Sequence, residues 1–260
     1  MTEDRLARIK LMLGEEAVGR LKNSFVVVVG LGAVGSYAVE GLARAGVGRM
    51  RLVDFDVIRA SNINRQLYAL GSTIGKYKAA LAAERVSDIN PHCRVEALEL
   101  FAGPETFGTI LEGSPDMVID AIDSLGPKAG LISETVKRSL PLIASMGAAL
   151  RTDPGAIRVG PLGEVRGCPL AAALRKLLRK NGTPLDLACV YSLEPVGELR
   201  RARQVDPETQ FYEQGRRRAA LGSLPTLTGI FGLVIANAVI KTLASGRDVT
   251  PKKSDKTDFL

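Results

Sequence analysis

Several side chains suited to binding phosphate groups recur in the first half of the chain. Arg65 offers a planar guanidinium fork to phosphate oxygens, and Lys78 offers a mobile point charge. Asn64 adds an uncharged donor, and Asp123 adds a carboxylate able to hold Mg²⁺ beside phosphates. Together these groups match what a nucleoside triphosphate requires.

A glycine-rich turn precedes these residues. The apolar run 25–29 leads into Gly30, Gly32 and Gly35, in the order Gly-x-Gly-x-x-Gly. Such glycines let the backbone bend tightly and approach a phosphate closely, and the helix that follows aims its free N–H groups at the anion. On its own the pattern also fits simple packing, and proteins that bind NAD, FAD and ATP share it.

Two acidic residues, Asp54 and Asp56, follow the next expected strand, about twenty residues beyond the glycines. Asp54 is placed to accept hydrogen bonds from ribose hydroxyls. A NAD enzyme needs only this first acid and leaves 61–66 and Lys78 without a role. Because ligands of open α/β sheets bind beyond the carboxyl ends of the strands, these residues together favour a triphosphate.

Each of these polar residues also has an ordinary structural interpretation. Asn64 could cap a helix, Arg65 could pair with Glu84, and Lys78 could simply be solvated. Their common position at strand ends and in the loop facing the glycine turn favours a shared ligand.

The elements that position these residues alternate between strand and helix. Strands are expected at 25–29, 50–54, 94–100, 117–120, 142–145, 156–159 and 188–191, and helices at 34–45, 73–89, 104–111, 128–139, 169–180 and 226–243. This order predicts a Rossmann-like α/β fold, which is a doubly wound, mostly parallel sheet with helices on both faces and a C-terminal extension.

The chain divides by composition into consecutive parts. Residues 1–24 form a helical N-terminal arm with a break near Gly14, and 25–147 form the nucleotide-binding region. Residues 148–246 continue the same domain and include a basic, arginine-rich loop at 193–223, which we expect to be mobile. The polar tail 247–260 is expected to be disordered.

Cysteine usage and hydropathy bear on location. The three cysteines, Cys93, Cys168 and Cys189, are widely spaced and suggest neither a disulfide framework nor a zinc ribbon, which favours the cytoplasm. Segment 226–243 is nearly long enough to span a membrane, but a glycine-interrupted helix buried against the sheet is the better interpretation. We therefore expect no stable membrane insertion.

Charge is unevenly distributed. The net charge is +7, and residues 166–218 hold eleven Lys or Arg against six Asp or Glu. Such a surplus is usually a solvated surface, but it also suits a nucleic-acid backbone.

The combination of motifs resembles the ThiF-like adenylating enzymes, relatives of ubiquitin-activating enzymes that attack ATP with a carboxylate. The resemblance covers nearly the whole chain. It implies that Asp54 and Asp56 hold the adenosine and that Asp123 binds Mg²⁺. The phosphate-binding residues that it implies are Asn64, Arg65 and Lys78, beside Gly30, Gly32 and Gly35. Arg65, Lys78 and Asp123 would then be catalytic. The resemblance also implies a homodimer in which Arg5 or Arg8 reaches the partner's site.

Several stretches are similar to the branch of this family that dehydrates threonylcarbamoyladenosine in tRNA. They are 89–95, 118–124, 169–172 and 189–192. This similarity implies that ATP activates the carboxylate of the modified nucleoside as an acyl adenylate, which then cyclises with expulsion of AMP. The basic last third would dock tRNA.

Two other functions remain open. One is an adenylyltransferase for the C-terminal glycine of a small sulfur carrier, working with a cysteine desulfurase or sulfur acceptor. It would be favoured by an exposed catalytic cysteine in the long loop or by zinc-binding cysteine pairs, and the sequence shows neither. Cys189, in an expected strand, and Cys168, beside a proline, are interpreted as packed side chains rather than sulfur carriers. The other is a non-catalytic nucleotide-binding dimer, which the full set of phosphate-binding residues argues against.

Overall fold

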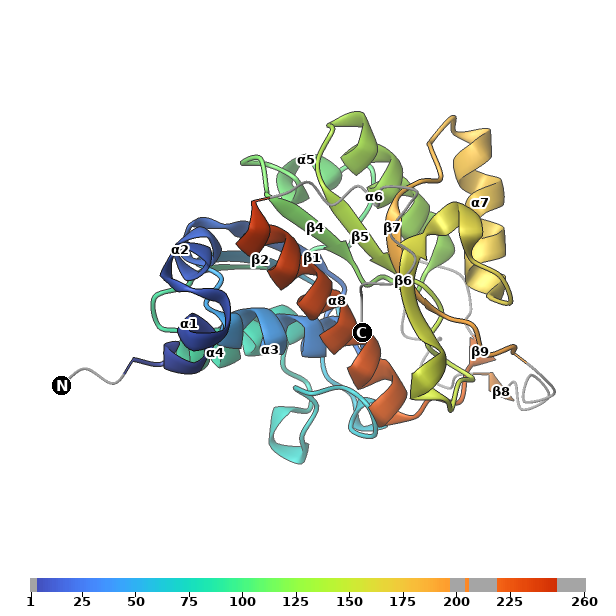
Figure 1. Ribbon diagram of the computed structural model, residues 1–260. Coiled ribbons are helices and arrows are strands. Elements are labelled where there is room, and N and C mark those ends of the chain that lie inside the picture. The colour runs from blue at the N-terminus through green and yellow to red at the C-terminus, as the bar shows by residue number, and fades with distance from the viewer. Residues whose placement is uncertain (1–3, 197–203, 206–218, 247–260) are drawn as a thin grey trace.

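A computed structural model describes residues 4–196, 204–205 and 219–246 and contains one central sheet (Figure 1). Its strand order is β3-β2-β1-β4-β5-β7-β6, and all neighbouring pairs are parallel except β6 and β7. The strands are β1 (Phe25–Val29), β2 (Arg49–Val53), β3 (Arg94–Leu98), β4 (Met117–Asp120), β5 (Leu142–Ser145), β6 (Ile157–Pro161) and β7 (Ala188–Ser192). The predicted doubly wound, mostly parallel fold is confirmed.

Helices cover both faces of the sheet (Figure 1). One face carries α2 (Glu15–Asn23), α3 (Gly35–Ala45), α4 (Lys78–Ile89) and α8 (Pro225–Ser245), and the other carries α5 (Phe107–Ile110), α6 (Leu125–Lys137) and α7 (Pro169–Lys180). The short helix α1 (Ala7–Leu13) precedes α2. Strand β1 is buried on both sides, with Val26 and Val28 in one core and Val27 and Val29 in the other. This explains its unbroken apolar sequence.

Helix α4 begins later than the sequence pattern predicts. The expected helix at 73–89 is shortened because Gly75 has φ +85° and Tyr77 forms an antiparallel bridge with Val57. The Ile58 N–H also donates to the Lys76 carbonyl at 2.8 Å. Lys78 therefore stands in the first turn of α4, close to the end of β2. The helix expected at 104–111 is likewise reduced to α5.

Helix α8 packs into the fold. It is long and apolar enough to cross a membrane, and 56% of its most apolar window is buried. A Cβ on Gly232 would lie 2.3 Å from the Val34 carbonyl oxygen, so the two backbones touch where α8 crosses α3. Phe231, Ile235 and Val239 join the core beneath. This is the buried helix that the sequence predicts.

Two expected segments lie mainly outside the described residues. Within the loop 193–223, the structure describes two short antiparallel strands, β8 (Gln204–Val205) and β9 (Ala219–Ala220), while 197–203 and 206–218 are outside the description. The tail 247–260 is also outside it. The expectations of mobility and disorder stay predictions.

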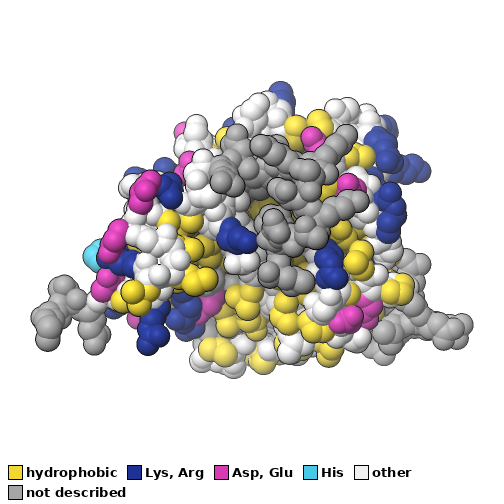
Figure 2. Space-filling view, in the orientation of Figure 1, with side chains coloured by type: hydrophobic (Ala, Val, Ile, Leu, Met, Phe, Trp, Pro, Cys, Tyr) yellow, Lys and Arg dark blue, Asp and Glu magenta, His cyan; other side chains and the backbone are white. Residues whose placement is uncertain are grey.

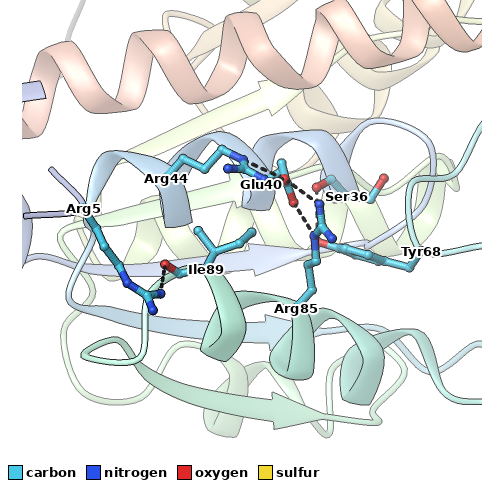
Figure 3. Close-up of polar contacts among 7 residues, drawn as sticks. All are labelled: Arg5, Ser36, Glu40, Arg44, Tyr68, Arg85 and Ile89. Atoms are coloured by element: carbon cyan, nitrogen blue, oxygen red, sulfur yellow. Dashed lines mark hydrogen bonds and ion pairs between the residues drawn. The ribbon is translucent and has the colours of Figure 1, made fainter. Parts of the chain in front are cut away.

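An ion-pair network joins α3 to α4 (Figure 3). Glu40 on α3 accepts hydrogen bonds from Arg44 at 2.8 Å and from both Nε and Nη2 of Arg85 at 3.0 Å. Burial alone would raise the pKa of Glu40, but the bonds from Arg85 and Arg44 outweigh it and hold the pKa below its usual value. The network fixes the glycine-turn helix against the helix that begins at Lys78.

Glu40→Gln should therefore destabilise the protein near neutral pH by about 1 kcal/mol. Because the folded-state pKa of Glu40 is lowered, its contribution is present above the unfolded value and is lost as the pH falls through the folded value. Urea unfolding of both proteins at neutral and acidic pH measures this. The gap between them should narrow as the pH falls below 4.5, the ordinary pKa of a glutamate, and a gap that stays constant would contradict the assignment.

Candidate nucleotide-binding site

Two glycines of the turn after β1 are required by the fold itself. Gly30 has φ +91°, and a Cβ on it would meet the Ala121 backbone at 2.9 Å. A Cβ on Gly35 would lie 1.8 Å from the Gly30 carbonyl oxygen. The turn is thus closed on itself and pressed against the segment that follows β4. This contact brings the glycine turn beside the loop that holds Asp123.

Gly32 differs from its neighbours. A Cβ on it would meet only the Gln66 side chain, at the ordinary distance of 3.7 Å. The Gln66 Oε1 atom is buried and has no hydrogen-bond partner. An uncrowded glycine beside an unsatisfied buried acceptor fits a place where a ligand approaches the backbone.

This contrast predicts different results for two alanine variants. Gly32→Ala should keep the melting temperature within a few degrees but weaken ATP binding at least tenfold, because the methyl group would occupy ligand space. Gly35→Ala should fail to fold, because its methyl group overlaps a backbone carbonyl. Calorimetric ATP titration and thermal melting measure both effects. Unchanged ATP affinity in Gly32→Ala would show that the glycine turn does not contact ATP.

Asp54 organises the turn rather than standing free. Its Oδ2 accepts the Leu31 N–H at 2.7 Å and its Oδ1 accepts the Asp56 N–H at 2.9 Å. Burial raises the pKa of Asp54, and the charge of Lys78 opposes this rise. The side chain thus ties the end of β2 to the glycine turn, and contact with a ribose would add to that role.

Lys78 and Asp56 form an ion pair. The Lys78 Nζ lies 3.0 Å from Asp56 Oδ2, with the two side chains 7% and 17% exposed. The alternative that Lys78 is merely solvated is therefore wrong. The pair places the Lys78 ammonium group at the carboxyl edge of the sheet. It lies close to the glycine turn, because Asp54 accepts hydrogen bonds from the N–H groups of both Asp56 and Leu31.

Arg65 is partly exposed and lightly held. Its Nη1 donates to the Ser61 carbonyl and to Asn64 Oδ1, each at 2.9 Å. Asn64 is exposed. The same loop is anchored to the first turn of α3, because the Tyr68 hydroxyl donates to the Ser36 carbonyl at 3.1 Å (Figure 3). The loop is fixed at its base, while the Arg65 guanidinium stays near the surface.

The segment after β4 contains a buried ion pair that the sequence did not reveal. Lys128 Nζ lies 2.7 Å from Asp120 Oδ2, and both side chains are fully buried. Asp120 also accepts the Ile122 N–H at 3.0 Å, which shapes the turn leading to the exposed Asp123. Burial raises the pKa of Asp120, against the opposing charge of Lys128.

The described residues contain no cluster of three or more His, Cys, Asp or Glu that could hold a metal ion. Asp123 is the remaining candidate ligand. A single carboxylate suits Mg²⁺ that is bound mainly through substrate phosphates. The residues present therefore fit a magnesium–nucleotide complex better than a metal held by protein alone.

A family model described as the ThiF family matches residues 3–258. The chain belongs to the ThiF family. A tRNA threonylcarbamoyladenosine dehydratase from Bacillus subtilis is 39% identical over 92% of this chain and 94% of its own length. The enzyme of the same description from Escherichia coli is 35% identical over 89% and 90%.

Solved structures agree with this family assignment. The crystal structure of the Escherichia coli enzyme, TcdA, in complex with ATP superimposes with a TM-score of 0.81 at 32% identity, covering 93% of this chain and 94% of that one. A complex of the same enzyme with AMP gives the same TM-score. The predicted family and fold are confirmed.

The N-terminal arginines of this ThiF-family protein lie apart from its own glycine turn. Arg5 Nη1 donates to the carbonyls of Asp88 and Ile89, at the C-terminal end of α4 (Figure 3). Arg8 is exposed on α1. That either residue reaches the site of a partner subunit stays a prediction.

Proposed function

We propose that this ThiF-family protein is an ATP-dependent tRNA threonylcarbamoyladenosine dehydratase. The observation that carries the proposal is the meeting of the glycine turn, the Asp56–Lys78 pair and the Asp123 segment at one edge of the sheet. Relatives with that activity in their names match about nine tenths of the chain. The substrate is a tRNA whose modified adenosine carries a free carboxylate.

The first step is activation of that carboxylate. One carboxylate oxygen attacks the α-phosphorus of ATP, the bond to the β-phosphate oxygen breaks, and pyrophosphate leaves with the electron pair. Arg65 and Lys78 neutralise the charge that develops on the phosphates, and Asp123 would hold Mg²⁺. Bound there, the ion would add positive charge beside the phosphate oxygens.

The Asp56–Lys78 pair suggests how the lysine is kept ready. The Lys78 Nζ is held 3.0 Å from Asp56 Oδ2, near the edge of the sheet. When ribose hydroxyls donate hydrogen bonds to Asp56, the Lys78 ammonium has N–H donors available for a phosphate oxygen. Asp54 keeps the turn in place throughout through its bonds to Leu31 and Asp56.

The second step is ring closure within the substrate. A nucleophilic atom of the neighbouring carbamoyl group attacks the activated carbonyl, loses its proton to solvent, and AMP departs with the former carboxylate oxygen. The tRNA thereby loses the elements of one water. No nucleophile from the protein is needed, so catalysis consists of positioning and charge stabilisation.

For tRNA docking we propose the exposed face of α7. Lys and Arg side chains gather over this helix (Figure 2). Lys176, Arg179 and Lys180 are exposed on it, a pattern that suits a phosphate backbone. The arginine-rich segments 200–203 and 216–218 lie outside the described residues.

We further propose a cytoplasmic homodimer, in which Arg5 or Arg8 approaches the partner's nucleotide. The three cysteines are free, as suits a reducing compartment. They are also buried, and burial raises the pKa of Cys93 to about 11 and raises that of Cys189 as well. Buried thiols make poor sulfur carriers, so the proposal includes no cysteine desulfurase or sulfur acceptor as partner.

An isotope experiment tests the adenylation step. The substrate tRNA is prepared with heavy oxygen in its carboxylate and incubated with the protein and Mg-ATP. The account requires one heavy oxygen in the AMP released, detected by mass spectrometry. Release of unlabelled AMP would show that the carboxylate never attacks ATP. Formation of ADP and phosphate would show that ATP phosphorylates the carboxylate instead of adenylating it.

A further inference from the structure

Arg151 is a buried arginine with most of its hydrogen bonds unmade. Its side chain is 2% exposed, and its Nη2 donates to the Gly167 carbonyl at 3.0 Å. Its Nε and Nη1 have no hydrogen-bond partner, which leaves three of the five N–H donors unsatisfied. A buried cation in this condition is costly, and such a group in a native fold indicates a missing partner.

The other buried cations among the described residues are paired. Lys78 and Lys128 each contact a carboxylate, and Arg51 contacts Glu96 together with backbone carbonyls. Arg151 has no such carboxylate within ion-pair distance in that part of the chain.

Glu194, whose pKa the charge of Arg151 helps to lower, has its oxygens committed elsewhere. They accept the Asp153 N–H and the Thr152 N–H and hydroxyl. The Asp153 N–H is the largest cause of the low pKa of Glu194, ahead of the bonds from Thr152 and the charge of Arg151. Glu194 therefore acts on Arg151 only through longer-range attraction, and among the described residues no carboxylate forms a direct hydrogen bond or ion pair with this guanidinium.

The N-terminus of α7 lies beside this arginine. Cys168 is the N-cap, and its sulfur, a weak acceptor, receives the Ala171 N–H at 3.5 Å. A Cβ on Gly147, just beyond β5, would lie 3.4 Å from that sulfur, which places the start of α7 at the carboxyl edge of the sheet. A twelve-residue helix with a weak cap adds its own positive end to the unpaired guanidinium.

We propose that Arg151 and the N-terminus of α7 bind the carboxylate of the substrate nucleoside before it is adenylated. The inference rests on the proposed function and deepens it. Strand β5 is the neighbour of β4, so the two carboxyl ends are only about 5 Å apart. Arg151 thus lies on the same edge as Asp123. A cation there offsets the repulsion between an anionic carboxylate and the phosphates that it must approach.

The first test compares the binding of two tRNAs in the absence of ATP. One carries threonylcarbamoyladenosine, and the other is the same tRNA with unmodified adenosine. Wild-type protein should bind the modified tRNA more tightly than the unmodified one. Arg151→Met should weaken binding of the modified tRNA by about tenfold or more and leave binding of the unmodified tRNA unchanged. Its melting temperature should stay equal or rise, because an unpaired buried charge is replaced by an apolar chain. Arg158→Met, which removes an exposed arginine on β6, is the matched control. It should change neither the preference for the modified tRNA nor the melting temperature.

The outcomes separate the possible roles of Arg151. Equal loss of affinity for both tRNAs would make it a backbone-phosphate contact, and a lower melting temperature with preference intact would make it structural. Either result overturns the inference. If wild-type protein neither prefers nor converts the modified tRNA, the proposed function fails as well.

A second measurement needs no variant. The free nucleoside threonylcarbamoyladenosine should raise the melting temperature of the wild-type protein, and its neutral carboxamide analogue should not. Equal shifts from both compounds would overturn the inference.

Discussion

Arg65→Ala should reduce ATP-dependent turnover by about 100-fold or more and leave the melting temperature unchanged. Arg65 contacts only the Ser61 carbonyl and its neighbour Asn64 among the bonds described for it, and its side chain is partly exposed. Its removal therefore costs the fold little, whereas the phosphates lose a planar, charged donor. Single-turnover measurement of AMP release, with a melting curve on the same sample, tests this.

The matched control is Arg94→Ala. Arg94 is exposed at the start of β3, at the opposite edge of the sheet, and should keep full turnover. Lys78→Ala is a less clean test, because it leaves Asp56 without its partner and should lower stability together with activity. Wild-type turnover in Arg65→Ala would exclude this residue from phosphate binding.

Lys128→Met should lower the free energy of unfolding by about 3–5 kcal/mol. The change removes the ammonium group that lies 2.7 Å from Asp120 Oδ2. The Asp120 carboxyl group is then left without its ion-pair partner in a fully buried site. It should also disturb the turn that carries Asp123. Urea denaturation measures the loss.

The double variant Asp120→Asn with Lys128→Met is the control for this second prediction. An asparagine keeps an acceptor for the Ile122 N–H and carries no charge, so most of the lost stability should return. If the double variant is as unstable as Lys128→Met, packing around the lysine chain, rather than the unpaired charge, causes the loss.

The sequence predicted the elements that local pattern controls. Strand β1 and the turn after it could be placed because an apolar run followed by spaced glycines has few other solutions. The start of α4 was wrong, because Gly75 and the bridge from Tyr77 to Val57 depend on a loop folding back. Propensity alone would have continued that helix over the turn.

The candidate site was predicted as a set of residues but not as a set of contacts. Asp54 and Asp56 were expected near the nucleotide, but their bonds to Leu31 and Lys78 come from tertiary packing. The same holds for the pair of Asp120 and Lys128. A lysine among apolar neighbours at 129, 131 and 132 was the one available signal, since a charge at a core-facing position needs a partner.

Arg151 illustrates the limit of sequence reasoning more sharply. It stands in a polar turn after β5, where an exposed arginine is the ordinary expectation. Only the structure shows that the chain buries it beside the start of α7 with donors unpaired. No periodicity or spacing carries that information.

Nucleoside analysis of the tRNA is the most direct measurement of the central claim. Threonylcarbamoyladenosine-bearing tRNA is incubated with the protein, with and without Mg-ATP, and digested for mass spectrometry. We expect the modified nucleoside to lose one water only when ATP is present. An unchanged nucleoside, with ATP–pyrophosphate exchange appearing only after a small carrier protein is added, would contradict the proposed activity.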